Sequence, residues 1–316
     1  MGDIGDGYLT YSVKNILRIL PGKLYQTFRS LLRILPDKSF VSLQYLKYHH
    51  HLLDLKNPRT FNEKLQWYKL FYRNPLMTDL TDKYEVRKYI ESKGHGGLLN
   101  DLFGVYDDPD AINYSELPKS FVLKATHGCG MNIICKDKEN INWEEYRKIT
   151  AKWLKINYFN YGREWAYKNI RPRLVCEKYL ENEEFNELID YKFYCYAGEP
   201  KVLFVCTGRY SDEGVKYNAY DLYWNRIYVN KGKASSNLII EKPDNLNLMI
   251  DIARTLSQGF PFMRVDLYSV KGEITFGELT FYPDNGLNPF TPDEYNYFFG
   301  DFLILPAKRK WQTLNI

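Results

Sequence analysis

The segment FVLKATHGCGMNIIC, residues 121–135, constrains the fold more than any other stretch of the sequence. Two apolar, strand-forming runs flank a short turn that contains Gly128 and Gly130, and Lys124 stands near the end of the first run. Such runs around a glycine-containing turn predict a β-hairpin. Glycines also let backbone N–H groups close over phosphate oxygens, and a lysine at the strand end supplies positive charge for them. The GxxxxGK[ST] order of a Walker A loop is absent, so the segment is either a phosphate-binding turn of another kind or a plain hairpin.

A second pair of predicted strands, 262–270 and 273–281, carries charged side chains within mostly apolar runs. Arg264 and Asp266 are two residues apart and therefore share a face, and the returning strand can place Glu278 beside Asp266. Two converging carboxylates repel each other unless a cation lies between them. Mg²⁺ held by one or two carboxylates and by substrate phosphates would meet that need. The alternative is a solvated face with a cross-strand pair between Arg264 and Glu278.

Strand and helix signals alternate over the rest of the chain and predict an α+β fold with antiparallel sheets. The expected strands are 119–125, 131–136, 173–180, 190–197, 201–207 and 222–229, and the expected helices in this part are 142–157 and 245–258. Within the strand 190–197, Asp190 and Lys192 share one face.

Two further helices are expected before the first of these strands. Thr60 and Glu63 are spaced as a capping box, which predicts an amphipathic helix within 57–75. A helix over 80–94 follows, and its boundary signals are Thr81 or Asp82 at the start and Gly94 at the end. The residues between this helix and 119 are interpreted as a connection.

The composition is that of an ordinary soluble globular protein, with 45% apolar and 26% charged residues. The net charge of +4 is too small to indicate nucleic-acid binding. Neither a signal peptide nor an apolar run of membrane-spanning length is present, so a cytoplasmic protein is expected. The five cysteines show no CxxC spacing and are interpreted as reduced core residues. The run from His49 to His51 lacks the cysteine or acidic partners of a metal site.

The excess positive charge lies in the first 50 residues, which hold seven Lys or Arg against three acids. This region contains a short repeat, ILRILPGK at 16–23 and LLRILPDK at 31–38. The apolar spacing predicts two short amphipathic helices, each ending at a proline. With basic residues on the opposite face, residues 8–38 could lie against the inner surface of the cell membrane. A helical hairpin packed on the body of the protein is the alternative.

In this order, the motifs resemble those of the ATP-grasp superfamily. The stretches FVLKATHGCGMNIIC, NPRTFNEKLQWYKL and ELTFYPDNG are similar to its teichuronopeptide-biosynthesis (TupA-like) branch, and the similarity covers about residues 36–305. The resemblance implies two α+β lobes with antiparallel sheets that clamp Mg-ATP. It divides the chain into a basic helical N-terminal region at 1–56, a second helical region at 57–118, a small lobe at 119–180 and a large lobe at 181–316.

The resemblance also implies roles for individual residues. The expected nucleotide-binding residues are Lys83, Lys124, Thr126, His127, Gly128, Gly130, Glu177, Lys178, Tyr179, Leu180, Asp190 and Lys192. Among them the two lysines Lys83 and Lys124 would contact the phosphates, and the turn from Thr126 to Gly130 would be a flexible lid. The segment from Glu177 to Leu180 would present backbone groups to adenine, Asp190 would hold the ribose hydroxyls, and Lys192 and Arg209 would face the phosphates. Arg264 and Lys124 would act in catalysis, and Mg²⁺ would be held by Asp266, Glu278 and Thr280.

The sequence departs from the superfamily at Thr280. A metal-binding Asn usually follows the late Glu in an ExN pattern, but here the sequence is ELT. A hydroxyl could serve as the ligand, or Asp284 or Asn285 of the following PDNG could supply it.

Members of this branch are associated with bacterial surface-polysaccharide synthesis. The resemblance therefore implies an ATP-dependent carboxylate–amine ligase, which activates a uronic acid carboxyl of a capsular or related glycan and joins it to an amino acid or amine. Three tyrosines that could line a sugar site are Tyr282, Tyr295 and Tyr297. The open alternatives are a glycosyltransferase, whose only metal-binding signal is DPD at 108–110, a sugar kinase, and a non-catalytic scaffold.

Overall fold

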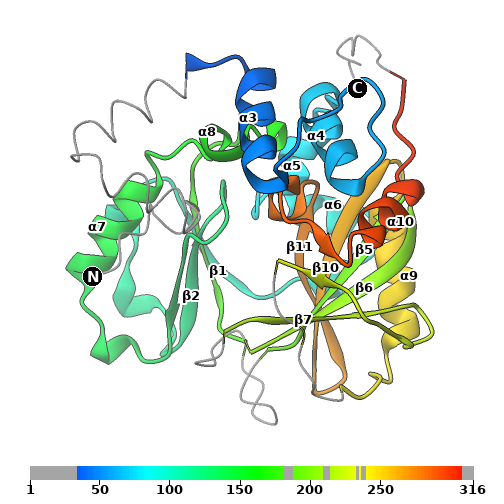
Figure 1. Cartoon of the computed structure of the whole chain (residues 1–316). Coiled ribbons are helices and arrows are strands. Elements are labelled where there is room, and N and C mark those ends of the chain that lie inside the picture. Colours follow the sequence, from blue (N-terminus) through cyan, green and yellow to red (C-terminus); the bar gives the residue numbers. More distant parts are fainter. Residues whose placement is uncertain (1–33, 181–187, 209–213, 233–234, 236–239, 308–316) are drawn as a thin grey trace.

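The computed structural model describes residues 34–180, 188–208, 214–232, 235 and 240–307. Two antiparallel sheets face each other, and a layer of helices lies across one end of both (Figure 1). Most of the repeat-containing segment 8–38 and Arg209 fall outside the described residues, so the expected N-terminal amphipathic helices stay predictions.

The smaller sheet has four strands in the order β1-β4-β2-β3. These strands are β1 (Leu102–Tyr106), β4 (Leu174–Lys178), β2 (Phe121–Ala125) and β3 (Asn132–Cys135). Helix α7 (Trp143–Trp153) covers one face, where Trp153 packs with Phe121 and Leu123 in a core of its own. The sheet and α7 form the left side of the molecule in Figure 1.

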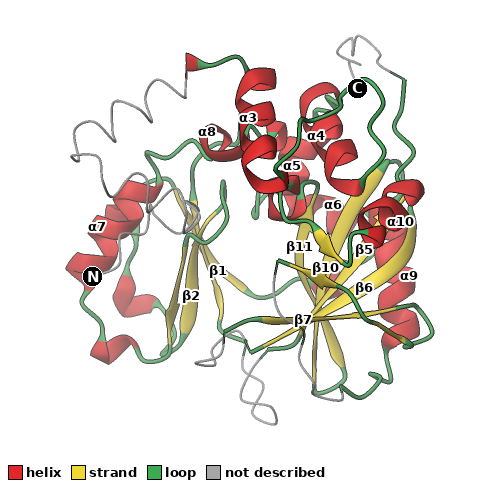
Figure 2. Ribbon diagram, in the orientation of Figure 1, coloured by secondary structure: helices red, strands yellow, loops and turns green. Residues whose placement is uncertain are grey.

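The larger sheet has six strands in the order β11-β10-β5-β6-β7-β8. These strands are β5 (Asp190–Tyr196), β6 (Glu199–Thr207), β7 (Lys216–Tyr220), β8 (Arg226–Ile227), β10 (Phe262–Val270) and β11 (Glu273–Thr280). Helix α9 (Leu246–Ser257) covers the outer face, and a two-stranded ribbon of β9 (Asn230–Lys231) and β12 (Phe290–Thr291) lies near α10 (Glu294–Phe302) (Figure 2).

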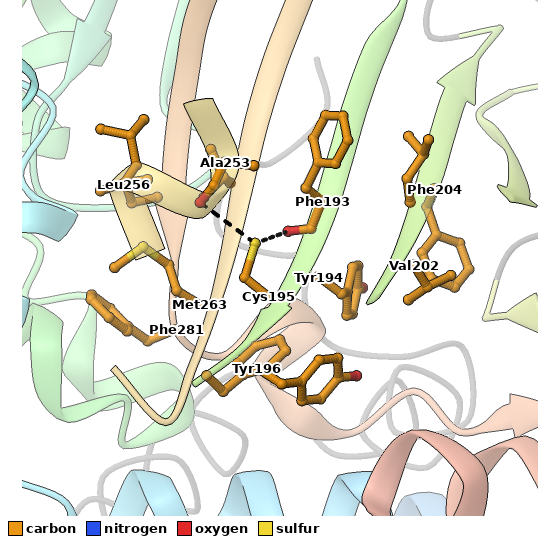
Figure 3. Close-up of a cluster of buried hydrophobic side chains, with 14 of the residues drawn as sticks. Phe193, Tyr194, Cys195, Tyr196, Val202, Phe204, Ala253, Leu256, Met263 and Phe281 are labelled. Carbon is orange, nitrogen blue, oxygen red and sulfur yellow. Dashed lines mark hydrogen bonds between the residues drawn. The ribbon is translucent and has the colours of Figure 1, made fainter. Parts of the chain in front are cut away.

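The largest core lies between this sheet and the helices around it. Figure 3 shows Cys195 on β5 beneath α9, with its thiol 3.8 Å from the backbone oxygen of Ala253 and 3.7 Å from that of Phe193. A free thiol at such a position behaves as a small apolar group with a weak donor. Cys195 is fully buried and Cys129 is the one exposed cysteine, so the interpretation of the cysteines as core residues holds for four of the five.

The helical layer is built on α4 (Phe61–Phe71), which buries nine of its eleven residues and packs against α10 and the 3₁₀ helix Pro283–Gly286. The other helices of the layer are α3 (Asp37–His49), α5 (Leu76–Thr81), α6 (Val86–Ser92) and α8 (Phe159–Gly162). Further 3₁₀ helices lie at Gly96–Leu98, Pro109–Ala111, Tyr114–Glu116, Lys138–Asn140 and Trp165–Tyr167. Helix α4 is therefore the buried centre of the helical layer.

Three sequence-based expectations are wrong. The helix expected over 80–94 spans only Val86–Ser92, because Asp82 caps a turn by accepting hydrogen bonds from the backbone N–H groups of Tyr84 and Glu85. The strand expected over 222–229 is mostly a turn between β7 and β8. The connection before residue 119 contains β1, which pairs with β4 at the edge of the small sheet.

The capping box at the start of α4 is confirmed. The Thr60 hydroxyl accepts from the Glu63 N–H at 3.2 Å, and the Glu63 carboxylate accepts from the Thr60 N–H at 3.0 Å. We expect Thr60→Ala to lower the free energy of unfolding by about 1 kcal/mol, measured by urea denaturation. Thr255→Ala on the exposed side of α9 is the matched control and should change it little. Equal losses in the two variants would contradict a capping role.

Candidate functional site

Lys124 lies near the end of β2 with its ammonium close to the opposite strand. Its Nζ is 2.6 Å from Oε2 of Glu177 on β4, and Arg87 of α6 lies 3.8 Å from the other oxygen of the same carboxylate. The Lys124 side chain is 31% exposed, whereas that of Glu177 is 10% exposed. Glu177 therefore pairs with two cations at the central strands of the small sheet, and the Lys124 side chain stays partly exposed.

The predicted glycine turn joins β2 to β3 as a hairpin. The turn is closed by a hydrogen bond of 2.9 Å from the Ala125 N–H to the Met131 carbonyl, and Gly130 has a left-handed φ of 72°. Gly128 has no room for a side chain, since a Cβ would lie 2.8 Å from the Tyr158 ring. The glycines thus serve a close approach and a positive φ, as a phosphate-covering turn requires.

Two side chains of this turn point inward. The His127 ring nitrogen Nε2 lies 3.0 Å from the Trp153 carbonyl, and the Thr126 hydroxyl donates to the Arg171 carbonyl at 3.3 Å. Both residues are buried, and burial lowers the pKa of His127. The Thr126 backbone is also paired, since its N–H donates to the Arg173 carbonyl and its carbonyl accepts from the Lys83 N–H. These two residues therefore form the base of the turn, while Cys129 and Gly130 form the exposed tip.

Lys83 connects the helical layer to this turn. It lies between α5 and α6, its N–H donates to the Thr126 carbonyl at 3.2 Å, and its Nζ donates to the Gly128 carbonyl at 2.5 Å. Burial lowers the pKa of Lys83, and the nearby Glu278 carboxylate opposes that effect while Lys124 adds to it. The two predicted phosphate lysines and the large-lobe carboxylate are therefore close enough to interact electrostatically.

The large lobe contributes a row of paired charges on β5, β10 and β11. The register pairs Asp266 with both Lys192 and Glu278, and it pairs Arg264 with Thr280. The Arg264 guanidinium contacts both Asp266 oxygens at 2.6 and 2.7 Å and Glu278 Oε1 at 2.6 Å. The predicted convergence of Arg264, Asp266 and Glu278 on one face is confirmed.

Lys192 completes this row from the neighbouring strand. Its ammonium lies 2.5 Å from Asp266 and 2.6 Å from Asp190, and all three side chains are nearly inaccessible to solvent. Burial would lower the pKa of Lys192, but the two carboxylates raise it well above its usual value. Asp190 and Lys192 share a face as predicted, although Asp190 faces Lys192 and not an open surface for a ribose.

Glu278 and Asp266 differ in electrostatic environment. Burial alone would raise the pKa of Glu278, but Arg264, Lys192 and Lys83 lower it to about 2. Burial raises the pKa of Asp266, with repulsion from Asp190 and Glu278 acting in the same direction against the attraction of Arg264 and Lys192. Glu278 is thus the more strongly ionised carboxylate, and its side chain is 44% exposed.

These residues fit Mg²⁺ and a polyphosphate by the chemistry of their donor atoms. Glu278 Oε1 accepts from Arg264 and from the Thr280 hydroxyl at 2.9 Å, and the described part of the chain supplies no hydrogen bond to Oε2. Within the same part of the chain, no three His, Cys, Asp or Glu side chains are grouped to hold a metal. Mg²⁺ in proteins commonly uses one or two carboxylates together with phosphates and water. Asp266 has both oxygens paired with Arg264 and Lys192, so Glu278 is the carboxylate that could hold the ion.

The predicted adenine segment is partly occupied by its own lobe. The Lys178 N–H donates to the Asp101 carbonyl at 3.0 Å, and its carbonyl accepts from the Asn100 amide at 2.8 Å. By contrast, none of the described residues hydrogen-bonds to the backbone of Tyr179 or Leu180. Backbone recognition of adenine would therefore fall to these last two residues.

A second buried polar network lies beside the site and was not predicted. The Lys69 ammonium on α4 donates to Gln66 Oε1 and the Asn285 carbonyl, both at 2.8 Å, and to the Asn285 side chain at 2.5 Å. Glu164 lies close by, and burial raises its pKa against the attraction of Lys69. Burial raises the pKa of Tyr167 well above its usual value, and the negative charges of Glu164, Cys129 and Glu278 act in the same direction.

Gly162 on α8 lies directly against Asn285 of this network. A Cβ on Gly162 would lie 2.4 Å from the Asn285 side chain, so α8 approaches the Pro283–Gly286 loop closely. In the sequence, Lys69 appears only as one of the two lysines of NEKLQWYKL. An amphipathic helix ordinarily exposes its lysines to solvent, so the pattern did not indicate that Lys69 is buried.

The other candidates have structural roles. Asp108 caps the 3₁₀ helix Pro109–Ala111 by accepting from the Asp110 N–H at 2.9 Å, so DPD forms a turn. Asp284 forms an ion pair with the buried Lys231.

Of the three tyrosines expected at a sugar site, Tyr282 is buried in the core and Tyr295 stacks on Phe299, while Tyr297 is half-exposed. The histidine run packs on Tyr45, with His49 stacked at 4.0 Å.

Comparison with known proteins identifies one family. The sequence model of the family described as TupA-like ATPgrasp matches residues 63–304. No curated protein sequence matches the chain. Within the described residues, no helix combines the length and apolar character that crossing a membrane requires.

Solved structures with a similar fold are distant in sequence. D-alanine–D-alanine ligase from Bacillus anthracis in complex with ATP is 13% identical, with 65% of this chain and 56% of that chain covered at a TM-score of 0.39. The corresponding ligase from Helicobacter pylori is 11% identical, with 73% and 59% covered at a TM-score of 0.40. N5-carboxyaminoimidazole synthetase from Staphylococcus aureus with ADP is 11% identical, with 64% and 44% covered at a TM-score of 0.39. The chain therefore spans only about half the length of these proteins.

The lowered pKa of Glu278 predicts a pH dependence. A carboxyl whose pKa falls from 4.5 to about 2 on folding contributes stability above its unfolded pKa and loses it as the pH falls through the folded pKa. Between about pH 5 and pH 3, the wild type should therefore lose more free energy of unfolding than Glu278→Gln, measured by urea denaturation without nucleotide or Mg²⁺. Glu273→Gln, at an exposed position of the same strand, should follow the wild type. Parallel profiles for wild type and Glu278→Gln would refute the electrostatic account.

The buried Lys69 predicts a large stability effect. Lys69→Met removes the donor to three acceptor atoms and leaves Glu164 without its nearest cation. We expect the free energy of unfolding at neutral pH to fall by about 3 kcal/mol, as for other buried charges deprived of a partner. Lys152→Met at an exposed position of α7 should change it little. A loss below about 1 kcal/mol for Lys69→Met would contradict this account.

Proposed function

The chain belongs to the TupA-like ATP-grasp family, and on that premise we propose that it is an ATP-dependent carboxylate–amine ligase acting on a uronic acid carboxyl of a bacterial surface glycan. The family match confirms the resemblance seen in the sequence, the ATP-grasp fold and ATP as the nucleotide. The ligase chemistry on a glycan, the amine partner and an association of residues 8–38 with the inner membrane surface are parts of the proposal.

The observation that carries the proposal is the set of charges on the two lobes. The small lobe and helical layer present Lys124, Lys83 and a glycine turn, and the large lobe presents the exposed Glu278 carboxylate beside Arg264. Cations beside a turn that can offer backbone N–H groups suit a triphosphate, and an open carboxylate suits its Mg²⁺. This arrangement supports chemistry that depends on phosphate positioning and charge neutralisation.

ATP supplies a phosphoryl group that makes a carboxylate reactive, and Mg²⁺ neutralises charge on the phosphates. In the proposed reaction a carboxylate oxygen attacks the terminal phosphorus and ADP leaves. An amine then attacks the carbonyl carbon, and inorganic phosphate and one proton leave as the amide forms. Arg264 lies where it can stabilise negative charge on the transferred group, because Asp266 and Glu278 hold its guanidinium in place. Lys124 and Lys83 would orient the remaining phosphates.

Exclusion of water supports the same assignment of roles. An acyl phosphate hydrolyses unless the site is closed, and the tip at Cys129 and Gly130 is the exposed part of the turn that could cover it. Thr126 and His127 anchor the base of the turn through buried hydrogen bonds. The turn can thus move at its tip while its base stays fixed.

The first test is nucleotide binding. We expect Mg-ATP and Mg-ADP to raise the unfolding temperature of the wild type, since a ligand present at 100 times its Kd stabilises the folded state by about 2.7 kcal/mol. Lys124→Ala and Glu278→Ala should weaken the shift, and Lys152→Ala should not. A shift with a nucleotide-sugar and none with adenine nucleotides would favour a glycosyltransferase and overturn the proposal.

The second test is the reaction. Wild-type protein with Mg-ATP and glucuronic or galacturonic acid should form a hydroxamate when hydroxylamine is supplied, and should release ADP in an amine-dependent manner. ADP release with a phosphorylated sugar and no amine requirement would favour a sugar kinase. Binding of Mg-ATP without turnover on any uronic acid or amine would contradict the ligase and leave a nucleotide-binding scaffold.

A further inference from the structure

Arg173 forms a buried ion-pair cluster on the far side of Lys83. One guanidinium nitrogen, NH2, lies 2.9 Å from Oδ2 of Asp82 and 2.9 Å from Oε1 of Glu85. The guanidinium also stacks over the Tyr84 ring at 4.7 Å. The side chains of Arg173 and Asp82 are 11% and 3% exposed, so this is an interior contact and not a surface pair.

The cluster includes both ends of the turn that carries Lys83, which are Asp82 and Glu85. Asp82 uses its other oxygen, Oδ1, to accept from the backbone N–H groups of Tyr84 at 2.8 Å and Glu85 at 3.2 Å. The residue before Lys83 therefore holds the two backbone N–H groups that follow Lys83, and the same carboxylate binds Arg173. Because Asp82 and Tyr84 are both hydrogen-bonded, the backbone that carries Lys83 has little freedom to change the direction of its side chain.

Backbone hydrogen bonds complete a closed set of contacts. The Lys83 N–H donates to the Thr126 carbonyl at 3.2 Å, and the Thr126 N–H donates to the Arg173 carbonyl at 2.9 Å. Arg173 precedes β4 of the small lobe, Thr126 opens the glycine turn, and Lys83 belongs to the helical layer. Three segments that are distant in sequence thus meet at the base of the turn.

The Arg173 guanidinium donates to Asp82 and Glu85, whereas the contact of Arg173 with the turn is made by its backbone carbonyl. It borders a separate cavity of about 240 Å³, which is also lined by Asp79, Glu85, Asn169 and Ile170. None of the residues assigned to phosphates or Mg²⁺ lines this cavity. The contacts that connect the Arg173 guanidinium to the nucleotide site run through the Asp82–Glu85 turn, which carries Lys83.

We propose that Arg173 is a positioning residue for the nucleotide site, which fixes the Asp82–Glu85 turn to the small lobe so that the Lys83 ammonium stays against the glycine turn. Without the guanidinium, Asp82 would be a buried carboxylate without its cation, and the turn would gain freedom to rotate Lys83 away from the Gly128 carbonyl. This role concerns nucleotide binding alone and holds whichever acceptor the protein uses.

The experiment is a double-mutant cycle on Mg-ATP affinity, measured by isothermal titration calorimetry on the full-length protein. Arg173→Met should weaken binding roughly tenfold in the wild-type background, within the range of couplings seen in one ion-pair network. In the Lys83→Ala background it should have no further effect beyond about twofold, because its influence passes through that ammonium. Arg173→Lys, which keeps the positive charge, should recover part of the affinity.

Arg171→Met is the matched control. It removes an arginine two residues away whose side chain is 68% exposed and pairs with the exposed Asp107 at 2.8 Å. Affinity should stay at the wild-type value. If Arg173→Met does not fold, Glu85→Gln removes half of the cluster from a partly exposed position, and a smaller loss that again disappears in the Lys83→Ala background is expected.

Equal weakening by Arg173→Met in both backgrounds would show that Arg173 does not act through Lys83 and would overturn the proposal. Unchanged affinity in the wild-type background, or a wild type that does not bind Mg-ATP, would overturn it as well. Normal Mg-ATP binding with the expected cycle but without ligase activity would leave the positioning role intact and contradict only the ligase proposal.

Discussion

The structure depends on the need to pair charges that are buried in the large sheet. Lys192, Arg264 and Asp266 lie on the neighbouring strands β5 and β10, almost without solvent, on one face of the large sheet. An unpaired charge at such a position costs several kcal/mol, so these three side chains are tolerated only when β5, β10 and β11 align in one register. A slip of one residue would turn each charge to the opposite, apolar face. The residues that fix the strand register are thus the residues that form the site.

Charge pairing also links the strands of the small lobe, although its charged side chains are less buried than those of the large sheet. Glu177 neutralises Lys124 and lies near Arg87, which links β2, β4 and α6 around a single carboxylate. The Lys124 side chain stays partly exposed, at 31%, so its positive charge remains available to a ligand. Beside the site, α8 packs closely on the Pro283–Gly286 loop, where Gly162 leaves no room for a side chain against Asn285.

The sequence predicts the parts of this site that depend on short separations. The pairing of Asp266 with Glu278 and the shared face of Asp190 and Lys192 follow from the period of two in a strand and a short connecting turn. The glycine turn and the capping box are equally local. The order of these motifs along the chain resembles that of the TupA-like ATP-grasp branch, and the family match confirms this resemblance.

Other parts were not predictable from local patterns. Lys69, Glu164 and Asn285 meet from three separate segments, and none of them lies in a regular strand whose period would indicate a partner. The strand expected over 222–229 fails for a different reason. Its aromatic and β-branched residues favour a strand, but Asp221 accepts from the N–H groups of Tyr223 and Asn225 and bends the chain into a turn. Side-chain hydrogen bonds to the backbone overrode strand propensity there.

Thr280 shows how the departure from the ExN pattern changes the metal side of the site. Its hydroxyl donates to Glu278 Oε1 at 2.9 Å and accepts from Arg264 at 3.1 Å, so both of its functions are used within the carboxylate row. Thr280 therefore orients the Glu278 carboxylate through a hydrogen bond, whereas an Asn at this position could bind a cation through its amide oxygen. Asp284 does not replace that oxygen, because its charge is bound to the buried Lys231. If Glu278 holds Mg²⁺ as proposed, its single open oxygen would leave most of the coordination sphere to phosphate and water oxygens, which that ion accepts readily.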